Sequence, residues 1–426
     1  MDHFINPDRI TETFAYCLKS GLIKPDDDTS IVFYDFDQLK QKTKLLKQAF
    51  PENTLHTSAV KANPLIKVLE KVKDFNLGAE VASEGELRLV IKTGFSNDNI
   101  VFDSPAKTFQ ELEFALRNNI RINSDSFMEL DRISKIKETL SSNSKIGLRI
   151  NPQVGYGSIE ATSVAGEYSK FGIPLKNHLN EILDYFLKYN WLSGIHMHIG
   201  SQGCNADLLI NGFELGLKLI KEINQSIKNQ DRKLEFIDIG GGLPVSYHHN
   251  LTPPDIKDYG NRIKNMFGLY ELGNMQLITE FGRFLHANSG FILSKVEYAK
   301  HYNESNTIII HSGADILLRE CLNPGNWFHE FSVLNKEGKV KKSINTKKYH
   351  IAGPLCFAND IVARNVELPQ VDEGDYIVIH DTGAYTFGMW SKYLSRPFPK
   401  VIGFDNSNYK IIRNRESFDE IIKFWT

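Results

Sequence analysis

The stretch Leu55-His-Thr-Ser-Ala-Val-Lys-Ala-Asn-Pro64 decides how the rest of the chain is interpreted. Residues 55–60 are mostly small or apolar, which predicts a short buried strand. The Asn-Pro pair ends it, because proline cannot donate to a strand ladder and restrains the residue before it. Lys61 is therefore predicted at the C-terminal end of a strand, before a helix that begins near Leu65. A lone lysine there is usually a surface charge, so its meaning depends on the residues that accompany it.

Length and composition narrow the classes of protein. The chain has 426 residues, which predicts two domains, and its 41% hydrophobic and 24% charged residues are typical of a globular enzyme. Its 50 basic and 52 acidic residues give a net charge of −2, so we expect neither nucleic acid nor a membrane as partner. No apolar run is long enough to span a bilayer.

The cysteines and the N-terminus indicate a compartment. Cys17, Cys204, Cys321 and Cys356 are scattered without the spacing of metal ligands, so we expect free thiols, no metal site and a reducing environment. The first residues lack a charged segment followed by an apolar one, so no secretion signal is expected. These features predict a cytoplasmic protein.

Short apolar segments alternate with segments long enough for a helix. Eight such strands and their intervening helices predict a parallel (β/α)8 barrel, and an open doubly wound sheet is the alternative. The count of eight favours the barrel, as does the lack of a G-x-G-x-x-G motif after the first strand. The predicted strands are 55–61, 77–82, 99–102, 120–123, 145–150, 193–199, 234–239 and 276–280.

The pattern changes after about Asn288. Segments 291–298, 307–311, 349–352 and 376–380 are β-like and separated by turn signals, which predicts an all-β second domain, a barrel or sandwich. We expect residues 37–288 to form the barrel, and residues 1–36 and 289–426 to form the β domain.

Polar residues follow six of the predicted barrel strands. In this fold the active site lies at the C-terminal ends of the strands, so these residues are expected to meet there. They are Lys61, Glu80, Arg149 with Asn151, the run from His196 to Gln202, the run from Asp238 to Gly242, and the run from Glu280 to Arg283.

Two of these strand ends predict a phosphate site. Gly240, Gly241 and Gly242 leave backbone N–H groups open to an anion, and Arg283 follows the next strand. A flexible turn is the commoner meaning of a glycine run, but the loops after strands seven and eight often bind phosphate in this fold.

The remaining groups complete a recognisable set. The Lys61 amine is suited to attach an aldehyde, Glu280 to hold a proton on a heteroaromatic nitrogen, and His198 to stack on a planar ring. Together with a phosphate site, these are what pyridoxal 5'-phosphate requires.

The motifs resemble those of the fold-type III pyridoxal phosphate decarboxylases, which act on diaminopimelate, ornithine, arginine and carboxynorspermidine. The resemblance spans roughly residues 30–400, and the His-Ile-Gly-Ser-Gln run and the length lean towards the diaminopimelate branch. The stretches that show it are Ala59-Val-Lys-Ala-Asn-Pro64, Glu80-Val-Ala-Ser-Glu-Gly-Glu-Leu87, His198-Ile-Gly-Ser-Gln202, Asp238-Ile-Gly-Gly-Gly-Leu243, Glu280-Phe-Gly-Arg283, Gly353-Pro-Leu-Cys356 and Gly383-Ala-Tyr385.

The resemblance implies a role for each matching residue. Lys61 attaches the cofactor, His198 stacks on its ring, Glu280 pairs with its nitrogen, and Glu80 and Arg149 are supporting charges. Cys356 acts in the partner subunit's site and returns a proton after carbon dioxide leaves, so a homodimer with shared active sites is expected. The phosphate-binding set is Ser201, Gly240, Gly241, Gly242, Gly282, Arg283 and Tyr385.

Departures from the family pattern affect the substrate. Phe281 stands where the family has proline, and Phe357 stands where it has an acid for the substrate's distal ammonium. Arg319 falls near the position of an arginine for the distal carboxylate, and Asp315 or Asp360 is a candidate for the missing negative charge. The expected substrate is meso-diaminopimelate, a basic D-amino acid such as D-lysine or D-ornithine, or a modified amino acid.

Two other functions remain open at this point. Amino-acid racemisation uses the same cofactor and barrel type, although the Cys356 motif is unlike it. A non-catalytic binding protein, like the antizyme inhibitors related to ornithine decarboxylase, is the second alternative, although such relatives have lost cofactor residues that are present here.

Overall fold

The computed structural model describes residues 4–270, 272, 274–302, 305–406 and 408–426. It divides into two compact units. One comprises residues 42–245 and 253–284, and the other comprises residues 1–41, 246–252 and 285–426. Within the described residues, no helix combines the length and hydrophobicity needed to cross a membrane.

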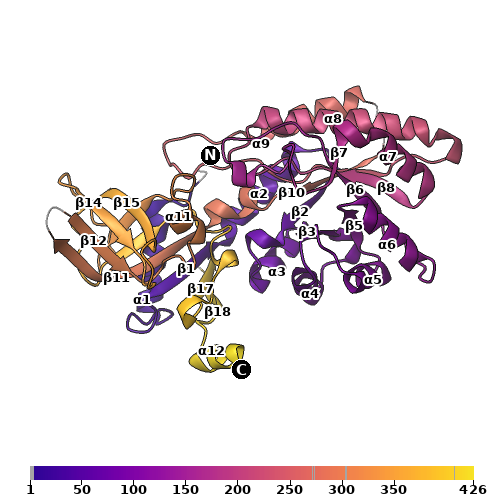
Figure 1. Ribbon diagram of the computed structural model, residues 1–426. Helices are drawn as coiled ribbons and strands as arrows, with labels where there is room; N and C mark the ends of the chain where they lie inside the picture. Colours follow the sequence, from indigo (N-terminus) through magenta and orange to yellow (C-terminus); the bar gives the residue numbers. More distant parts are fainter. Residues whose placement is uncertain (1–3, 271, 273, 303–304, 407) are drawn as a thin grey trace. The chain divides into compact units, whose positions relative to one another are not determined.

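The first unit is a closed barrel of parallel strands (Figure 1). The described strands follow the order β5-β4-β3-β2-β10-β9-β8-β6, and β5 pairs with β6 to close the ring. This confirms the predicted (β/α)8 class and excludes the open sheet. The strands are β2 (Leu55–Ala59), β3 (Gly78–Val81), β4 (Ile100–Asp103), β5 (Arg121–Ser124), β6 (Ile146–Asn151), β8 (Leu192–His196), β9 (Phe236–Asp238) and β10 (Gln276–Glu280).

Helices with local capping signals surround these strands (Figure 1). Thr108 and Glu111 form a capping box at the start of α5, and Ser83 and Asn205 cap α4 and α8. The barrel helices are α3 (Ile66–Asp74), α4 (Glu84–Thr93), α5 (Phe109–Arg117), α6 (Phe127–Lys137), α7 (Leu175–Lys188), α8 (Ala206–Ser226) and α9 (Ile256–Leu269), and α2 (Phe36–Ala49) precedes β2.

The first strand is shorter than predicted. β2 ends at Ala59, and Lys61 lies in a single 3-10 turn, Val60–Ala62, rather than in the strand. The Asn63 backbone N–H donates to the Val60 carbonyl at 2.9 Å and closes this turn. The prediction extended the strand too far because the small residues around Lys61 suit either conformation.

The barrel interior is packed around Phe236. Phe236 clusters with buried Val101 and Ile278, and the Arg121 guanidinium lies 4.9 Å from its ring centroid. A Cβ at Gly194 would lie 2.5 Å from the Phe236 ring. This glycine therefore makes room for a large aromatic side chain in a closed core.

The second unit is built on a mixed sheet. The described strands run in the order β15-β14-β12-β11-β1-β17-β18, and β16 pairs with β11 and β13. β1 is central, antiparallel to β11 and parallel to β17, so the N-terminal segment is part of this unit. The strands are β1 (Ser30–Asp35), β11 (Gly290–Tyr302), β12 (Ser305–Ile310), β13 (Phe331–Leu334), β14 (Lys347–Ala352), β15 (Ile361–Leu368), β16 (Tyr376–Ile379), β17 (Lys400–Asp405) and β18 (Asn408–Arg413).

The expectation of a second domain built on sheet is confirmed, and helices accompany the sheet. The second unit also contains α1 (Pro7–Lys19), α11 (Leu318–Leu322) and α12 (Phe418–Trp425). Buried Phe14 and Cys17 of α1 belong to the same core cluster as Phe33 and Phe291 of the sheet. The unit is therefore mostly sheet, with one helix contributing to its core.

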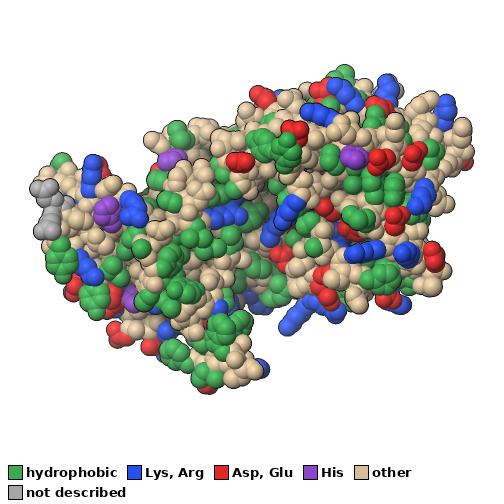
Figure 2. All heavy atoms as spheres, viewed as in Figure 1, with side chains coloured by type: hydrophobic (Ala, Val, Ile, Leu, Met, Phe, Trp, Pro, Cys, Tyr) green, Lys and Arg blue, Asp and Glu red, His purple; other side chains and the backbone are tan. Residues whose placement is uncertain are grey.

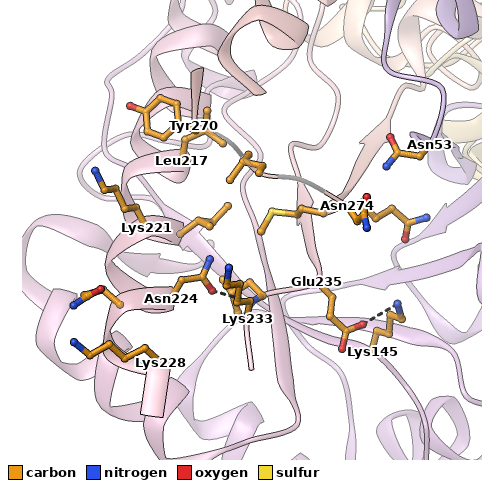
Figure 3. Close-up of a pocket in the computed structure, with 16 residues that line it drawn as sticks. Asn53, Lys145, Leu217, Lys221, Asn224, Lys228, Lys233, Glu235, Tyr270 and Asn274 are labelled. Carbon is orange, nitrogen blue, oxygen red and sulfur yellow. Dashed lines mark hydrogen bonds and ion pairs between the residues drawn. The ribbon is translucent and has the colours of Figure 1, made fainter. Parts of the chain in front are cut away.

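A cavity of about 950 Å³ opens at the N-terminal ends of the barrel strands (Figure 3). Its lining includes Lys145, Leu234 and Gln276, which lie at the starts of β6, β9 and β10. Lys145 pairs with Glu235 at 2.9 Å on its rim. Lys61 follows the C-terminal end of β2, so this cavity is at the wrong end of the barrel for the predicted chemistry.

Replacing Gly194 tests the packing of the barrel. Gly194→Ala should lower the free energy of unfolding by about 1–3 kcal/mol, because its Cβ meets the Phe236 ring. Gly268→Ala on α9 is the matched control, since a Cβ there meets nothing within 4 Å and alanine favours a helix. Urea unfolding should show opposite signs for the two variants, and equal effects would contradict the packing argument.

Candidate active site

Lys61 and Glu80 form the central ion pair of the barrel. The Lys61 Nζ lies 2.7 Å from both carboxylate oxygens of Glu80, at the ends of neighbouring strands β2 and β3. The Glu80 side chain is fully buried, whereas 42% of the Lys61 side chain is exposed. Burial raises the pKa of Glu80 to about 7, although the Lys61 charge opposes the shift. The amine is thus held in place and still accessible.

The glycine run after β9 is a tight turn that lies against the end of β10. Gly240 and Gly242 have φ values of +62° and +106°, which other residues rarely adopt. The Glu280 N–H donates to the Gly240 carbonyl at 2.8 Å, and a Cβ at Gly241 would lie 2.3 Å from the Glu280 carbonyl oxygen. Any side chain would fill this space, so the turn presents bare backbone.

His198 lies beside this turn, just beyond the end of β8. The Gly241 N–H donates to its Nδ1 at 3.2 Å, so that nitrogen is the acceptor. Burial lowers the pKa of His198 well below its usual range, and the charges of Arg149 and Lys61 add to the effect. The ring is therefore neutral and suited to stacking on a flat ligand.

Arg283 and Ser201 lie together, as the predicted phosphate set requires. The Arg283 Nε donates to the Ser201 Oγ at 3.4 Å, and the Arg283 side chain is buried. Phe281, the departure from the family's proline, packs against the rings of Phe50 and Phe284 and fills the core. A buried guanidinium beside a hydroxyl group and a glycine turn is a suitable phosphate site.

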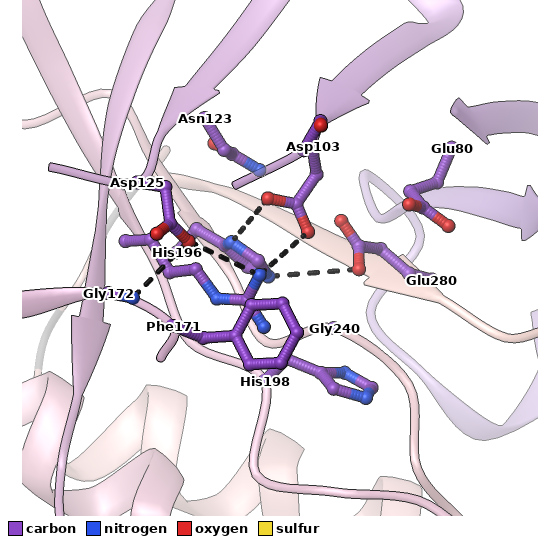
Figure 4. A network of polar contacts seen from close by, with 12 residues as sticks. Glu80, Asp103, Asn123, Asp125, Phe171, Gly172, His196, His198, Gly240 and Glu280 are labelled. Atoms are coloured by element: carbon purple, nitrogen blue, oxygen red, sulfur yellow. Dashed lines mark hydrogen bonds and ion pairs between the residues drawn. The ribbon is translucent and has the colours of Figure 1, made fainter. Parts of the chain in front are cut away.

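Behind these groups lies a network of buried acids and bases (Figure 4). His196 lies between Asp103 and Glu280, and Asp103 also meets Arg149 at 3.5 Å. The pKa of Glu280 is raised well above its usual range by burial first, and then by the carboxylates of Asp238, Glu80 and Asp103. Burial and the neighbouring carboxylates therefore favour the protonated form of Glu280 over the carboxylate.

Sequence reasoning did not single out Asp103, placed Asp238 at a polar strand end without giving it a role, and gave His196 no role in the site. Asp103 ends β4, so the rule used for the six polar strand ends applies to it as well. Asp103 was missed because the third strand was predicted to end one residue earlier. Asp238 accepts hydrogen bonds from Gly240 N–H and the Asn123 amide, both at 3.0 Å.

The predicted site residues of the second unit lie on two loops and on helix α11. Cys356 is exposed, and Phe357 makes an edge contact with Tyr393, with ring centroids 6.2 Å apart. Asp360 is buried and accepts from the backbone N–H groups of Ala314 and Leu355 at 2.7 and 2.5 Å. Its carboxylate thus stabilises its own loop, an arrangement that does not favour the predicted contact with a substrate.

Tyr385 and Arg319 lie together in the same unit. The Arg319 guanidinium is 4.8 Å from the Tyr385 ring centroid and 4.6 Å from that of Trp327. Tyr385 has a φ of +57°, a strained backbone conformation for a tyrosine. Such strain is often retained where a side chain serves a site.

These features fit pyridoxal 5'-phosphate. The barrel offers an accessible amine, a neutral stacking imidazole, a carboxyl group for the ring nitrogen, and a bare glycine turn beside a buried arginine. This combination at the C-terminal end of a (β/α)8 barrel defines the class of barrel enzymes that use this cofactor.

Comparisons with known proteins agree. Residues 36–287 match the family described as the pyridoxal binding domain of pyridoxal-dependent decarboxylases. The diaminopimelate decarboxylase of Buchnera aphidicola is 32% identical over 409 residues, covering 93% of both chains. The crystal structure of diaminopimelate decarboxylase from Helicobacter pylori with L-lysine has a TM-score of 0.84 at 29% identity, and the match covers 96% of this chain and 99% of that chain. A lysine/ornithine decarboxylase from Vibrio vulnificus, 20% identical with a TM-score of 0.75 over 88% of this chain and 95% of that one, shares the fold.

The chain therefore belongs to the pyridoxal-dependent decarboxylase family, in its diaminopimelate decarboxylase branch. It is a carboxy-lyase that uses pyridoxal 5'-phosphate. Decarboxylation is accordingly favoured over the racemase and binding-protein alternatives.

The raised pKa of Glu80 predicts a pH effect on stability. The folded state binds this proton more tightly than the unfolded chain, so the stabilisation is complete below about pH 4.5 and is lost as pH rises through about 7. Cofactor-free wild type should therefore lose up to about 3 kcal/mol of unfolding free energy relative to Glu80→Gln between pH 5 and pH 8.

Urea unfolding across this pH range measures the difference. Glu113→Gln, a change at the surface of α5, is the control and should follow the wild-type profile. Parallel profiles for wild type and Glu80→Gln would contradict the shifted pKa.

Proposed function

We propose that this enzyme decarboxylates diaminopimelate to lysine. Its alignment with diaminopimelate decarboxylases over nearly the whole chain supports this substrate most directly. Loss of one carboxyl group from diaminopimelate, with a proton in its place, leaves lysine, the molecule bound in the Helicobacter pylori structure. The proposal thus gives the enzyme a place in lysine biosynthesis.

Lys61 is proposed to hold the cofactor and to release it to the substrate amine. Bound pyridoxal 5'-phosphate supplies an electron sink that accepts the electron pair left when carbon dioxide departs. Glu80 keeps the Lys61 amine in position through its two 2.7 Å contacts. Because the pKa of Glu80 is raised to about 7, this carboxyl group gains or loses its proton near neutral pH. Its ion pair with the Lys61 amine is weakened or strengthened accordingly.

The rest of the barrel site is proposed to orient the cofactor. His198, which accepts from the Gly241 N–H, would stack on the ring, and Glu280 would face the ring nitrogen. Arg283, with Ser201 and the glycine turn of residues 240–242, would hold the phosphate. Gly282, which has no side chain, would leave the backbone beside Arg283 open to the phosphate. The Tyr385 hydroxyl group would be a further phosphate ligand. Arg149, paired with Asp103 and Asp125 at 3.5 Å, supplies supporting positive charge.

Substrate choice is proposed to depend on Arg319. A guanidinium binds a carboxylate through two parallel hydrogen bonds, which a distal ammonium cannot accept. Trp327 and Tyr385 flank Arg319 and limit its freedom. Because Phe357 carries no charge and Asp360 is engaged by its loop, selection rests on the distal carboxylate rather than on the ammonium.

The enzyme is proposed to act as a homodimer in which Cys356 serves the partner's site. Cys356 is exposed on its own unit, and an exposed apolar surface lies on the same unit (Figure 2). Tyr393 links Phe357 to this surface, and the Trp425 Nε1 donates to Ser395 Oγ at 3.1 Å. Exposed aromatic side chains of this kind favour an interface. The surface comprises Tyr393, Leu394, Phe418, Ile422, Phe424 and Trp425.

Two earlier expectations remain proposals. The domain boundaries at residues 36/37 and 288/289 divide the cofactor-binding barrel from the β domain that supplies Cys356 and Tyr385. The four free cysteines favour a reducing compartment, so a cytoplasmic location is proposed.

A substrate panel tests the proposed specificity. Carbon dioxide release is expected from meso-diaminopimelate and not from L- or D-lysine, L- or D-ornithine, or L-arginine, since these lack the distal carboxylate. Arg319→Gln should lower kcat/KM for diaminopimelate about 10- to 100-fold, the usual effect of losing hydrogen bonds to a charged group.

Two further variants sharpen this test. Arg319→Lys should recover part of the activity, and Arg364→Gln, at an exposed position of β15, should behave as wild type. Turnover of lysine or ornithine comparable to that of diaminopimelate would contradict the role of Arg319 and the substrate itself.

Mixing two inactive variants tests the shared site. Lys61→Ala and Cys356→Ala should each be impaired alone, whereas refolding them together should restore about a quarter of the native sites, because half of randomly paired dimers have one intact site. Mixing Lys61→Ala with the double variant is the control and should restore nothing. Equal activity before and after mixing would contradict a site built from two subunits.

A further inference from the structure

His196 occupies an unusual position in the barrel. It is the last residue of β8, fully buried, and lies between carboxyl groups from two other strands (Figure 4). Its Nδ1 is 3.6 Å from Asp103 Oδ1, and its Nε2 is 3.7 Å from Glu280 Oε2. These distances exceed a hydrogen bond, and within the described residues neither ring nitrogen has a hydrogen-bond partner.

The two carboxyl groups are incompletely paired as well. Asp103 Oδ1 and Glu280 Oε1 have no hydrogen-bond partner in the described part of the chain. Buried polar atoms without partners are costly, so four of them in one cluster call for a physical reason. A shift of about 0.7 Å on each side of the ring would bring both contacts to ordinary hydrogen-bond length.

Asp103 determines which nitrogen of His196 carries the proton. Arg149 lies 3.5 Å from the other Asp103 oxygen. Burial opposes ionisation of Asp103, but a protonated His196 and the permanent charges of Arg149, Lys107 and Lys61 outweigh it and lower the pKa of Asp103. An ionised Asp103 accepts hydrogen bonds only, so it selects the tautomer with hydrogen on Nδ1. The lone pair of Nε2 then points to Glu280.

The same arrangement offers a place for the proton of Glu280. Burial and the neighbouring carboxylates raise the pKa of Glu280, and so favour the protonated form of its carboxyl group, although the Lys61 charge opposes the shift. To pair with a protonated ring nitrogen it must be a carboxylate. Burial lowers the pKa of His196, the carboxylates of Asp103 and Asp238 oppose this shift, and the charges of Arg149 and Lys61 add to it. Glu280 faces the Nε2 of His196.

We propose that His196, held in one tautomer by Asp103, is a positioning residue that orients Glu280 and accepts its proton. The proton leaves the Glu280 carboxyl oxygen and binds His196 Nε2, and no other bond changes. The imidazolium then lies between two carboxylates, while Glu280 meets the ring nitrogen of the cofactor as an anion. This inference rests on the proposed function in one respect, that Glu280 faces that nitrogen.

A carboxylate that orients an imidazole, which in turn sets the state of a third group, is a recurring arrangement in active sites. Here the third group is the carboxyl group that would face the ring nitrogen of the cofactor. A purely structural histidine would instead affect the stability of the barrel and the binding of any ligand to the same extent. A positioning role and a structural role for His196 therefore predict different effects of the ring nitrogen on the affinity for the cofactor.

The test compares two ligands for the cofactor-free protein. One is pyridoxal 5'-phosphate, and the other is its analogue with carbon in place of the ring nitrogen. Dissociation constants are measured by fluorescence titration, and the ratio of the two constants isolates the contribution of the nitrogen. Wild type should prefer the natural cofactor, and Glu280→Gln should abolish most of that preference.

His196→Asn should reduce the same preference about 10- to 100-fold and leave binding of the carbon analogue nearly unchanged. Its amide replaces Nδ1 and leaves nothing at Nε2, whereas His196→Gln places an amide near Nε2 and should retain more of the preference. Asp103→Asn should act in the same direction as His196→Asn. His56→Asn is the matched control, a buried barrel histidine on β2 whose Nδ1 is bonded to Thr279 at 2.8 Å.

Each outcome has one meaning. Equal weakening of both ligands in His196→Asn and His196→Gln would overturn the inference and leave a structural role. A preference that survives Glu280→Gln would instead overturn the proposed role of Glu280, and the inference with it. Circular dichroism and Tm measurements establish that each variant folds. If neither His196 variant folds, the ratio of dissociation constants for Asp103→Asn decides between the positioning role and the structural role of His196.

Discussion

Repulsion among buried carboxyl groups is the constraint on which this site depends. Asp103, Asp238 and Glu280 end strands of one barrel, Glu80 is one residue before the end of another, and all four are buried. Like charges confined in a medium of low polarity raise one another's pKa, so such a cluster exists only with protons or cations to balance it. The barrel supplies both, through bound protons and through cations on other strand ends.

The balancing groups are the ones that serve the chemistry. Lys61 neutralises Glu80 at 2.7 Å and is the amine proposed to hold the cofactor. Arg149 pairs with Asp103, and the raised pKa of Glu280 concerns the carboxyl group that we propose to face the ring nitrogen of the cofactor. The charge interactions that allow this cluster of acids to be buried in a folded protein thus also set the pKa values of the groups proposed for catalysis.

Rigid backbone complements this charged cluster. The glycine turn after β9 lies so close to the end of β10 that a Cβ at Gly241 would meet the Glu280 carbonyl. The turn, His198 and Glu280 therefore hold one another in register, through the Gly241 N–H to His198 and the Glu280 N–H to Gly240. Precision of this kind requires elements of a closed barrel rather than mobile loops.

The sequence by itself determined the barrel class, the eight strands and the cofactor. Strand periodicity and polar strand ends depend on residues that are close together in the chain, so they can be recognised without the fold. It also indicated Lys61, His198, Glu280 and the glycines. Only the tertiary structure decided that Asp360 stabilises its own loop and that His196 lies between Asp103 and Glu280. Those contacts join strands far apart in the chain, and the pKa values they produce depend on burial and distance, which no local pattern encodes.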